Sequence, residues 1–365
     1  MISKTGSCKK FKGDRPCEYY WVDRKHDCWD SSSPYYEEYS HRILLIKLDA
    51  LGDVIRCTPL AEGIKKKYPG CKLIWLTQSE SIFFLKGNKF IDEVLSYNDE
   101  TVRALQCQEF DTIINLDKDS KATSMITLFN SDDKRGYGLS VDGHPFPLND
   151  GTKYHYDICL DNWGAKQKNT KTYQQMIFEA SELKFDDERM FVSLDEFKYK
   201  QFQSKFYEEN NIVSDDNLII LNTGCGPAFP HKKWTYDGYR ELIGDLLHDS
   251  NNKIILAGGK DEIERNTKLS NEYESDNIIN TTNKYTIEEF CFLVNLSKIV
   301  VTGDTMALHL AITFKKSILG LGKKFVRKEL DCLSCHDQFP CPYDGKCMSL
   351  IKSKKIFENI KKILY

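Results

Sequence analysis

Residues 43–60, which read ILLIKLDALGDVIRCTPL, join an apolar run to a Gly-Asp turn and the start of a helix. A run of leucine and isoleucine is typical of a strand that is buried on both faces, as in a parallel sheet. Ligands of open α/β sheets collect outside the carboxyl ends of such strands. We therefore expect Asp53 to be a catalytic carboxylate. The alternative is that Asp53 caps the helix and that Gly52 only permits a tight turn.

The alternation of strands and helices continues along the chain, which predicts an α/β fold with parallel sheets. Helices are expected up to about Tyr68 and at residues 172–183, 195–209 and 236–247. Further strands are expected at residues 72–77, 93–97, 111–116, 217–222, 253–257, 277–280, 299–302 and 317–321. The segment 139–171 is rich in Gly, Pro, Asn and Asp, so it is predicted to be a loop.

A chain of 365 residues is expected to form two domains of ordinary size. The pattern divides it into a cysteine-containing extension at 1–42, a first Rossmann-like domain at 43–185, a second at 186–350 and a terminal helix at 351–365. In that helix apolar residues fall on one face and lysines on another. The helix is expected to dock on the domains, with a return to the first domain as one option; the alternative is a basic face that binds a membrane surface.

The net charge is −3, with 51 basic and 54 acidic residues, so no general attraction to nucleic acid is expected. No apolar stretch is long enough to span a membrane, and residues 1–30 lack the apolar core of a secretory signal. We expect a cytoplasmic protein, with contact at the inner membrane face as a further option. In that reducing compartment closely spaced thiols favour metal binding over disulfides.

Seven of the 13 cysteines cluster at the two ends of the chain. Four thiolates as close as Cys332, Cys335, Cys341 and Cys347 can surround one tetrahedral zinc or iron ion, and reduced or disulfide-paired thiols are the alternative. Cys8, Cys17 and Cys28 leave one position of a second site unfilled. The alternative at that end is that Trp21 and Trp29 pack onto the first domain.

Three segments of the second domain carry residues suited to a nucleotide. The loop GCGPAFPHKKW offers glycine backbone and Lys232 to a diphosphate, although its lysines could simply be solvated. In VVTGDTMALHL, Thr305 offers donors at a helix start, whereas Asp304 is also a natural N-cap and His309 a candidate core histidine. In LAGGKDEIE, Glu262 is placed to bind a ribose or to face the helix dipole. No G-x-G-x-x-G follows a strand, which argues against a dehydrogenase.

These segments, in this order, resemble the sequence blocks of glycosyltransferase family 9, the ADP-heptose:lipopolysaccharide heptosyltransferases. The first block is LGDV followed by TPL, the second is a Lys-x-Trp at Lys232 and Trp234, and the third is an Asp-Thr/Ser-Gly-x-x-His run in which Met306 replaces the glycine. Thr223 stands where the family more often has proline. The cysteine loop is similar to the C-terminal cluster of many members and to the iron-holding finger of related protein-modifying heptosyltransferases.

The resemblance implies a GT-B architecture, in which two Rossmann-like domains face a central cleft. It implies inverting transfer of heptose from ADP-heptose to an acceptor hydroxyl, with Asp53 as the base and structural iron or zinc in the cysteine loop. The acceptor is expected in lipopolysaccharide core or another surface glycan; the alternatives are protein Ser/Thr hydroxyls, or a non-catalytic binding module. The residues expected to bind the donor are Gly52, Thr223, Gly224, Lys232, Glu262, Asp304, Thr305 and His309.

Overall fold

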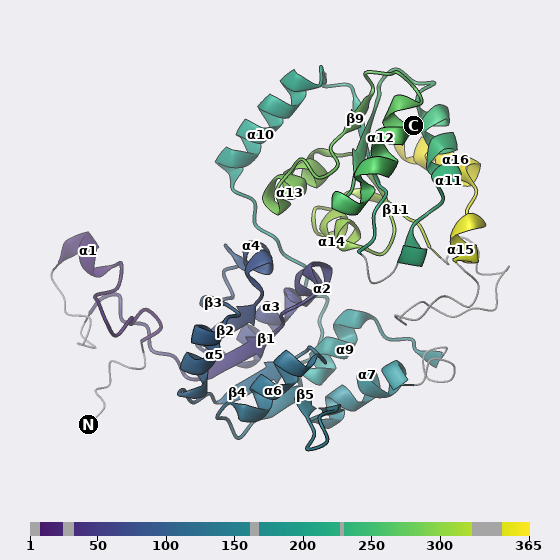
Figure 1. Cartoon of the computed structure of the whole chain (residues 1–365). Helices are drawn as coiled ribbons and strands as arrows, with labels where there is room; N and C mark the ends of the chain where they lie inside the picture. The colour runs from purple at the N-terminus through teal and green to yellow at the C-terminus, as the bar shows by residue number, and fades with distance from the viewer. Residues whose placement is uncertain (1–7, 25–32, 161–167, 227–229, 323–344) are drawn as a thin grey trace, which may run out of the picture. The chain divides into compact units, whose positions relative to one another are not determined.

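The computed structural model describes residues 8–24, 33–160, 168–226, 230–322 and 345–365 and divides the chain into two compact units (Figure 1). The first unit is Met1–Phe191 and the second is Val192–Tyr365. This division falls after Phe191, whereas the sequence pattern placed a boundary after residue 185. The reason is that the chain just before Phe191 is still bonded to the first unit: the Phe191 N–H donates to Thr58 Oγ1 at 2.9 Å, and Glu188 pairs with Lys66.

The first unit is built on a sheet with the strand order β3-β2-β1-β4-β5-β6. Neighbouring strands are parallel except for β5 and β6, which are antiparallel. The described strands are β1 (Arg42–Ile46), β2 (Lys72–Thr77), β3 (Glu93–Ser96), β4 (Thr112–Asn115), β5 (Lys134–Leu139) and β6 (Pro145–Pro147). The described helices are α1 (Tyr20–Asp23), α2 (Leu51–Cys57), α3 (Pro59–Lys67), α4 (Ile82–Leu85) after the short η2 (Ser79–Ser81), α5 (Asp99–Gln106), α6 (Ser120–Leu128), α7 (Asp150–Leu160) and α9 (Tyr173–Ala180).

Strand β1 has no polar alternation because helices cover both faces of the sheet (Figure 1). Ile43 and Leu45 pack in one cluster with residues of α2, α3 and α9. Leu44 and Ile46 point to the opposite face and pack with residues of α5 and α6. All four side chains are fully buried. The apolar run at the start of residues 43–60 is therefore the central strand of a doubly covered parallel sheet, as predicted.

The second unit contains a parallel sheet with the strand order β11-β10-β7-β8-β9. Figure 1 shows α10, α13 and α14 on one side of this sheet and α11, α12 and α16 on the other. The described strands are β7 (Asn217–Asn222), β8 (Asn252–Ala257), β9 (Ile278–Asn280), β10 (Ile299–Thr302) and β11 (Ser317–Gly320). The described helices are α10 (Glu196–Glu209), η3 (Pro230–Lys232), α11 (Tyr236–Leu246), η4 (Lys260–Glu262), α12 (Ile263–Asn271), α13 (Ile287–Leu296), α14 (Met306–Thr313), α15 (Lys346–Ser349) and α16 (Ser353–Leu364).

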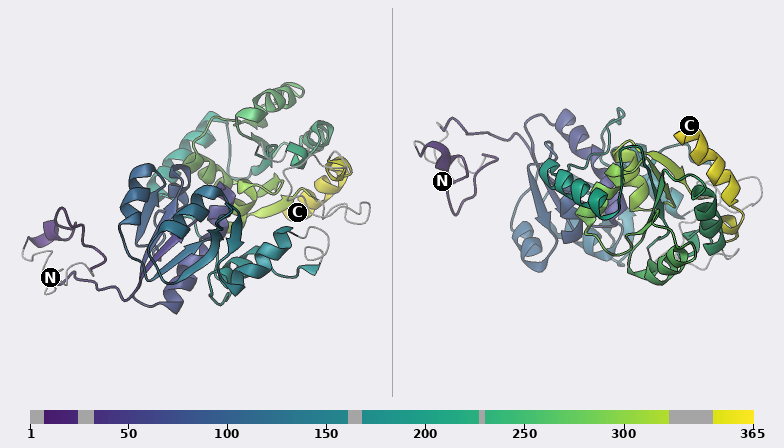
Figure 2. Two further views of the ribbon diagram at one scale, coloured as in Figure 1. Left: turned by 60° about the horizontal axis from the view of Figure 1, so that its bottom comes forward. Right: turned by 90° about the horizontal axis from the view of Figure 1, so that it is seen from above.

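The C-terminal helix α16 packs beside α11 within the second unit, as the yellow helix in Figure 2 shows. Ile356 and Ile360 are fully buried in the core of that unit, and the Ser353 hydroxyl donates to Glu241 at 2.6 Å. The expected docking on the domains is confirmed, but its partner is the second domain and not the first. The buried isoleucines are used for this packing. No helix in the described ranges is long and apolar enough to cross a membrane.

The prediction of a loop over residues 139–171 was wrong, because this segment contains β6 and α7. Pro145 and Pro147 suggested a loop, but β6 is the edge strand, where a missing N–H is tolerated. Helix α7 buries only Thr152 and Ile158, so its sequence has no apolar stripe to reveal it.

The N-terminal segment also differs from expectation in part. Cys8 and Cys17 are buried and line a small pocket together with Tyr35 and Tyr36. Trp21 is 59% exposed and contacts the ring of Tyr20, which does not support the alternative that it packs onto the first domain. Trp29 lies outside the described residues.

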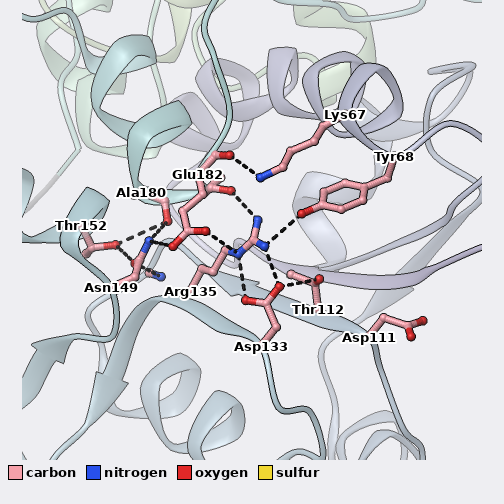
Figure 3. A network of polar contacts seen from close by, with 12 residues as sticks. Lys67, Tyr68, Asp111, Thr112, Asp133, Arg135, Asn149, Thr152, Ala180 and Glu182 are labelled. Carbon is pink, nitrogen blue, oxygen red and sulfur yellow. Dashed lines mark hydrogen bonds and ion pairs between the residues drawn. The ribbon is translucent and has the colours of Figure 1, made fainter.

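At the start of β5, Arg135 is buried in a polar network that joins the sheet to α9 (Figure 3). Its guanidinium donates to both carboxylate oxygens of Asp133, at 2.9 and 2.6 Å, and to the Tyr68 hydroxyl at 2.9 Å. It also donates to the Ser181 carbonyl at 3.0 Å and lies 3.4 Å from Glu182. Because these groups lie at the amino ends of the strands, we interpret the network as structural.

Candidate functional site

Asp53 lies in the first turn of α2, the helix that follows β1 through a short loop. The helix begins at Leu51, so Gly52 and Asp53 are its second and third residues and not a turn before it. The N-cap residue is Ala50, which makes no side-chain cap, so the interpretation of Asp53 as an N-cap was wrong. The Asp53 side chain is 40% exposed, and Arg56 donates to its Oδ1 at 3.0 Å. A carboxylate at the carboxyl edge of the sheet is thus open to solvent and oriented by one cation.

Arg56 is itself held by an aromatic ring. Its guanidinium carbon lies 3.7 Å from the ring centroid of Tyr173, the first residue of α9. Burial raises the pKa of Tyr173 well above its ordinary value, and its hydroxyl is 3.6 Å from Cys57 Sγ. Burial also raises the pKa of Cys57 to about 12. The Tyr173 hydroxyl and the Cys57 thiol are therefore neutral at ordinary pH. The negative charge that Arg56 contacts here is the Asp53 carboxylate.

Aromatic and cationic side chains continue from Tyr173 across α7 and β5. The ring of His155 packs edge-on against Tyr173, and His155 Nδ1 is 2.9 Å from the Tyr137 hydroxyl. Lys118 Nζ lies 4.9 Å from the Tyr137 ring centroid and donates to Cys159 Sγ at 2.6 Å. This set of contacts is called the Asp53 face, and its members are Asp53, Arg56, Lys118, Tyr137, His155 and Tyr173.

A buried ion pair between Lys47 and Asp117 lies beneath the loop that leads into α2. Asp117 also accepts from the Leu48 N–H at 2.5 Å, so it ties the end of β4 to that loop. Burial by itself lowers the pKa of Lys47, but the neighbouring Asp117 carboxylate outweighs it and the pKa is raised. Sequence reasoning missed this pair. The sequence feature that could have revealed the pair is Lys47, a lysine directly after an apolar strand.

In the second unit Thr305 occupies the N-cap position of α14 but makes no side-chain cap. Its hydroxyl instead accepts from the Asn222 amide at 3.1 Å and lies 3.0 Å from Thr302 Oγ1. Asp304 is not the N-cap; it is 59% exposed, with Oδ1 3.7 Å from His309 Nε2. His309 is largely buried in α14.

The loop that carries Lys232 passes beside the start of this turn. A Cβ built on Gly303 would lie 3.6 Å from the Lys232 carbonyl oxygen, so the two segments that the sequence singled out are neighbours. Lys233, and not Lys232, pairs with Glu262, at 2.5 Å. The Glu262 side chain is only 6% exposed and also accepts from the Gly259 N–H at 2.9 Å.

Gly224 and Thr223 belong to the interior side of this loop. A Cβ on Gly224 would come within 2.7 Å of the Glu262 carboxylate, so a larger residue here would displace that carboxylate. Thr223 is buried; its N–H donates to the Ala257 carbonyl at 3.0 Å, which a proline could not do, and its hydroxyl donates to Asn266 at 2.7 Å. We therefore assign the Thr223 hydroxyl to the interior of the unit and not to a ligand.

Three of the four predicted metal ligands, Cys332, Cys335 and Cys341, lie outside the described residues. Cys347 is described: it is buried in α15, in the same cluster as Trp234. Cys28 is also outside the described residues. Within the described parts of the chain, no group of three or more His, Cys, Asp and Glu side chains is arranged to hold a metal ion.

Comparison with solved structures finds proteins with a similar fold. The chain is similar to the glycosyl transferase family 9 structure from Veillonella parvula, with a TM-score of 0.67 at 18% identity over 90% of this chain and 98% of that one. It is also similar to the iron-containing, dodecameric heptosyltransferase TibC of enterotoxigenic E. coli in complex with ADP-D-beta-D-heptose. That likeness has a TM-score of 0.52 at 12% identity and covers 88% of this chain and 76% of that one.

Two relatives are similar in sequence. Lipooligosaccharide heptosyltransferase 2 of Campylobacter jejuni is 26% identical over 185 residues, which are 46% of this chain and 58% of that protein. The chain thus matches less than two thirds of that relative. Lipopolysaccharide core heptosyltransferase OpsX of Haemophilus influenzae is 21% identical over 79% of this chain and 80% of that protein.

The α/β sheet of each unit and the matching family model define the class of the chain, which is a glycosyltransferase. The model of glycosyltransferase family 9 (heptosyltransferase) matches residues 100–324, more than half of the sequence. The chain therefore belongs to glycosyltransferase family 9.

Proposed function

We propose that this enzyme transfers a heptose from ADP-heptose to a hydroxyl of a glycan acceptor, with inversion at the anomeric carbon. The observation that carries the proposal is the Asp53 carboxylate, which is exposed at the carboxyl edge of the first sheet and held by Arg56. Membership of a heptosyltransferase family and the ADP-heptose complex of TibC support the sugar and the nucleotide. The named activities of the Campylobacter and Haemophilus relatives support an acceptor in lipooligosaccharide or lipopolysaccharide core.

In the proposed reaction Asp53 accepts the proton of the acceptor hydroxyl as that oxygen attacks the anomeric carbon. The new carbon–oxygen bond forms on the side opposite the breaking bond to ADP, so the configuration inverts and ADP leaves with the electron pair. Arg56 orients the carboxylate, and the Tyr173 ring orients Arg56. Lys118 and the half-buried ring of His155 are proposed to meet the acceptor sugars, while the buried Tyr137 supports His155 from below.

The second unit is proposed to bind the donor. Lys232, the Thr305 hydroxyl and the first N–H groups of α14 meet the diphosphate and stabilise its growing charge as ADP departs. Asp304, which is 59% exposed at the same turn, is proposed to line the donor site, with the largely buried His309 3.7 Å behind it. Glu262 is proposed to hold Lys233 and the Gly259 backbone, which fixes the edge of the nucleotide site.

We also propose that Cys332, Cys335, Cys341 and Cys347 hold one structural iron or zinc ion. The support is their spacing, the preference of four thiolates for these metals and the iron-containing TibC structure. No step of sugar transfer passes through this ion. Metal analysis of the purified chain should give about one ion per chain. A Cys332→Ser/Cys335→Ser variant should lose it, and an unchanged metal content in that variant would refute the ligand set.

The decisive experiment for the donor is calorimetry with ADP-heptose, ADP-glucose and UDP-glucose, followed by an assay of ADP release in the presence of acceptor glycan. Binding of ADP-heptose, ADP release and an inverted anomeric centre by NMR are expected. Lys232→Ala should weaken ADP binding by about 10- to 100-fold, because a charge-assisted contact is lost. Lys284→Ala, which removes an exposed lysine of the same unit, is the matched control. Failure of the wild-type chain to bind any ADP-sugar would overturn the proposal.

A further inference from the structure

The carboxyl ends of β7 and β10 share a small network of uncharged side chains. The two strands are paired so that Asn222 lies opposite Thr302. The Asn222 amide nitrogen is 2.9 Å from Thr302 Oγ1, 3.1 Å from Thr305 Oγ1 and 3.4 Å from the Gly224 carbonyl oxygen. The Tyr239 hydroxyl donates to the Asn222 carbonyl at 2.9 Å and fixes the strand end. One amide thus reaches two oxygens of the β10–α14 turn and one of the loop that follows β7.

The donors and acceptors of this network can be assigned from its chemistry. The Gly224 carbonyl oxygen can only accept, so the group that faces it must be the amide NH₂ of Asn222 and not its oxygen. The amide nitrogen cannot accept and carries two hydrogens, so both threonine oxygens accept from Asn222, and the longer contact to the Gly224 carbonyl shares one of these hydrogens. Thr302 has a single hydroxyl hydrogen, and this donates to the Gly303 carbonyl at 3.0 Å.

The hydrogen of Thr305 is therefore available for one other acceptor. Within the network it can only go to Thr302 Oγ1, at 3.0 Å, and it is not used to cap α14. A phosphate oxygen is a stronger acceptor than a threonine hydroxyl, because hydrogen bonds to charged groups are about twice as strong as neutral ones. An anion at the start of α14 should draw this hydrogen outward, while Asn222 keeps the Thr305 oxygen in place.

We propose that Asn222 is a positioning residue that makes Thr305 a hydrogen-bond donor to the diphosphate of the nucleotide sugar. The proposal rests on the proposed donor-binding function of the second unit. Asn222 itself does not contact the ligand in this arrangement. All three side chains are neutral, so none of them repels the diphosphate.

The test is a double-mutant cycle in ADP binding, measured by calorimetry with adenosine as the second probe. Thr305→Val should raise the Kd for ADP by about tenfold and leave that for adenosine unchanged. Asn222→Leu should have the same selective effect in the wild-type chain. In the Thr305→Val background Asn222→Leu should have no further effect, because Asn222 acts through the Thr305 hydroxyl.

Asn217→Leu is the matched control, because Asn217 is a buried amide at the opposite end of the same strand and donates to Asn252 at 3.0 Å. It should affect stability but not the ratio of ADP to adenosine affinity. Additive effects of the two substitutions, or equal losses of ADP and adenosine binding in Asn222→Leu, would overturn the proposal. If Asn222→Leu does not fold, the Thr305→Val variant still tests the proposal, because an unchanged ADP affinity of that variant would overturn it. A wild-type chain that binds no ADP would instead refute the proposed donor-binding function of the second unit.

Discussion

Two groups made of Asp, Arg and Tyr stand at opposite ends of the first sheet and differ in how completely they are bonded. At the amino end Arg135 is 8% exposed and donates to Asp133, Tyr68 and the Ser181 backbone (Figure 3). At the carboxyl end Arg56 is 25% exposed and makes one hydrogen bond, to Asp53, within the described part of the chain.

The tyrosines also act differently in the two groups. The Tyr68 hydroxyl accepts a hydrogen bond from Arg135, whereas Tyr173 offers its ring to Arg56 and keeps its hydroxyl buried against Cys57. The Arg135 group holds structure together, because opening it leaves the buried guanidinium of Arg135 without partners. The two carboxylates are about equally exposed, at 39% for Asp133 and 40% for Asp53, but Arg56 is more exposed than Arg135, so the Arg56 pair contributes less to stability and can meet a substrate. The same three residue types thus serve two purposes, which burial decides.

The largest expected effect comes from removing the negative charge at the exposed end. Asp53→Asn should lower kcat for sugar transfer by about 10³-fold, because the amide cannot accept the acceptor proton. Its thermal midpoint and its ADP affinity should stay near those of the wild type. Asp133→Asn is the matched control and should lower the thermal midpoint with kcat of the folded enzyme preserved. Undiminished turnover by Asp53→Asn would remove Asp53 from the role of base.

The next effect is on stability and comes from the buried end. Arg135→Leu should reduce the free energy of unfolding in urea by about 2 kcal/mol, since it leaves the buried Ser181 carbonyl and the Tyr68 hydroxyl without their donor. Arg56→Leu, at the exposed end, should change the same quantity by less than about 1 kcal/mol. Equal losses in the two variants would mean that the two groups do not differ in the way their burial indicates.

A smaller effect tests the ring under Arg56. Arg56→Lys keeps the charge but loses the flat stack on Tyr173, so kcat should fall by about tenfold with little change in stability. Arg42→Lys is the control, because Arg42 lies 4.7 Å from the Phe110 ring at the amino end of β1, away from Asp53. If both variants lose the same fraction of activity, the effect does not come from positioning Asp53.

The smallest effect concerns the thiol under the Asp53 face. Because burial raises the pKa of Cys57 to about 12, its thiolate is nearly absent at pH 8. Mass spectrometry after brief iodoacetamide treatment of the native chain should find Cys57 unlabelled and the exposed Cys107 labelled. Rapid labelling of Cys57 before Cys107 would show that Tyr173 and Arg56 do not seal this side of the helix.

Much of the fold could be predicted from local pattern. The apolar runs at residues 43–46, 217–222 and 299–302 are the central strands of the two sheets, because strands covered on both faces need continuous apolar sequence. Helix α7 and strand β6 could not be predicted in the same way. They lie at an edge and bury few side chains, so their conformation depends on neighbours distant in sequence.

For the candidate site, the sequence by itself identified Asp53, Lys232, Asp304 and Thr305, since a strand end next to a helix start is visible as a local pattern. Only the tertiary structure decided which groups these residues meet. Arg56 meets Tyr173 more than a hundred positions away, Lys47 meets Asp117, and Asn222 meets Thr305, each pair joined by packing of separate elements. Local sequence can fix where a side chain stands on its strand or helix. Burial, charge pairing and the direction of a hydroxyl hydrogen depend on contacts between elements, which only the folded chain brings together.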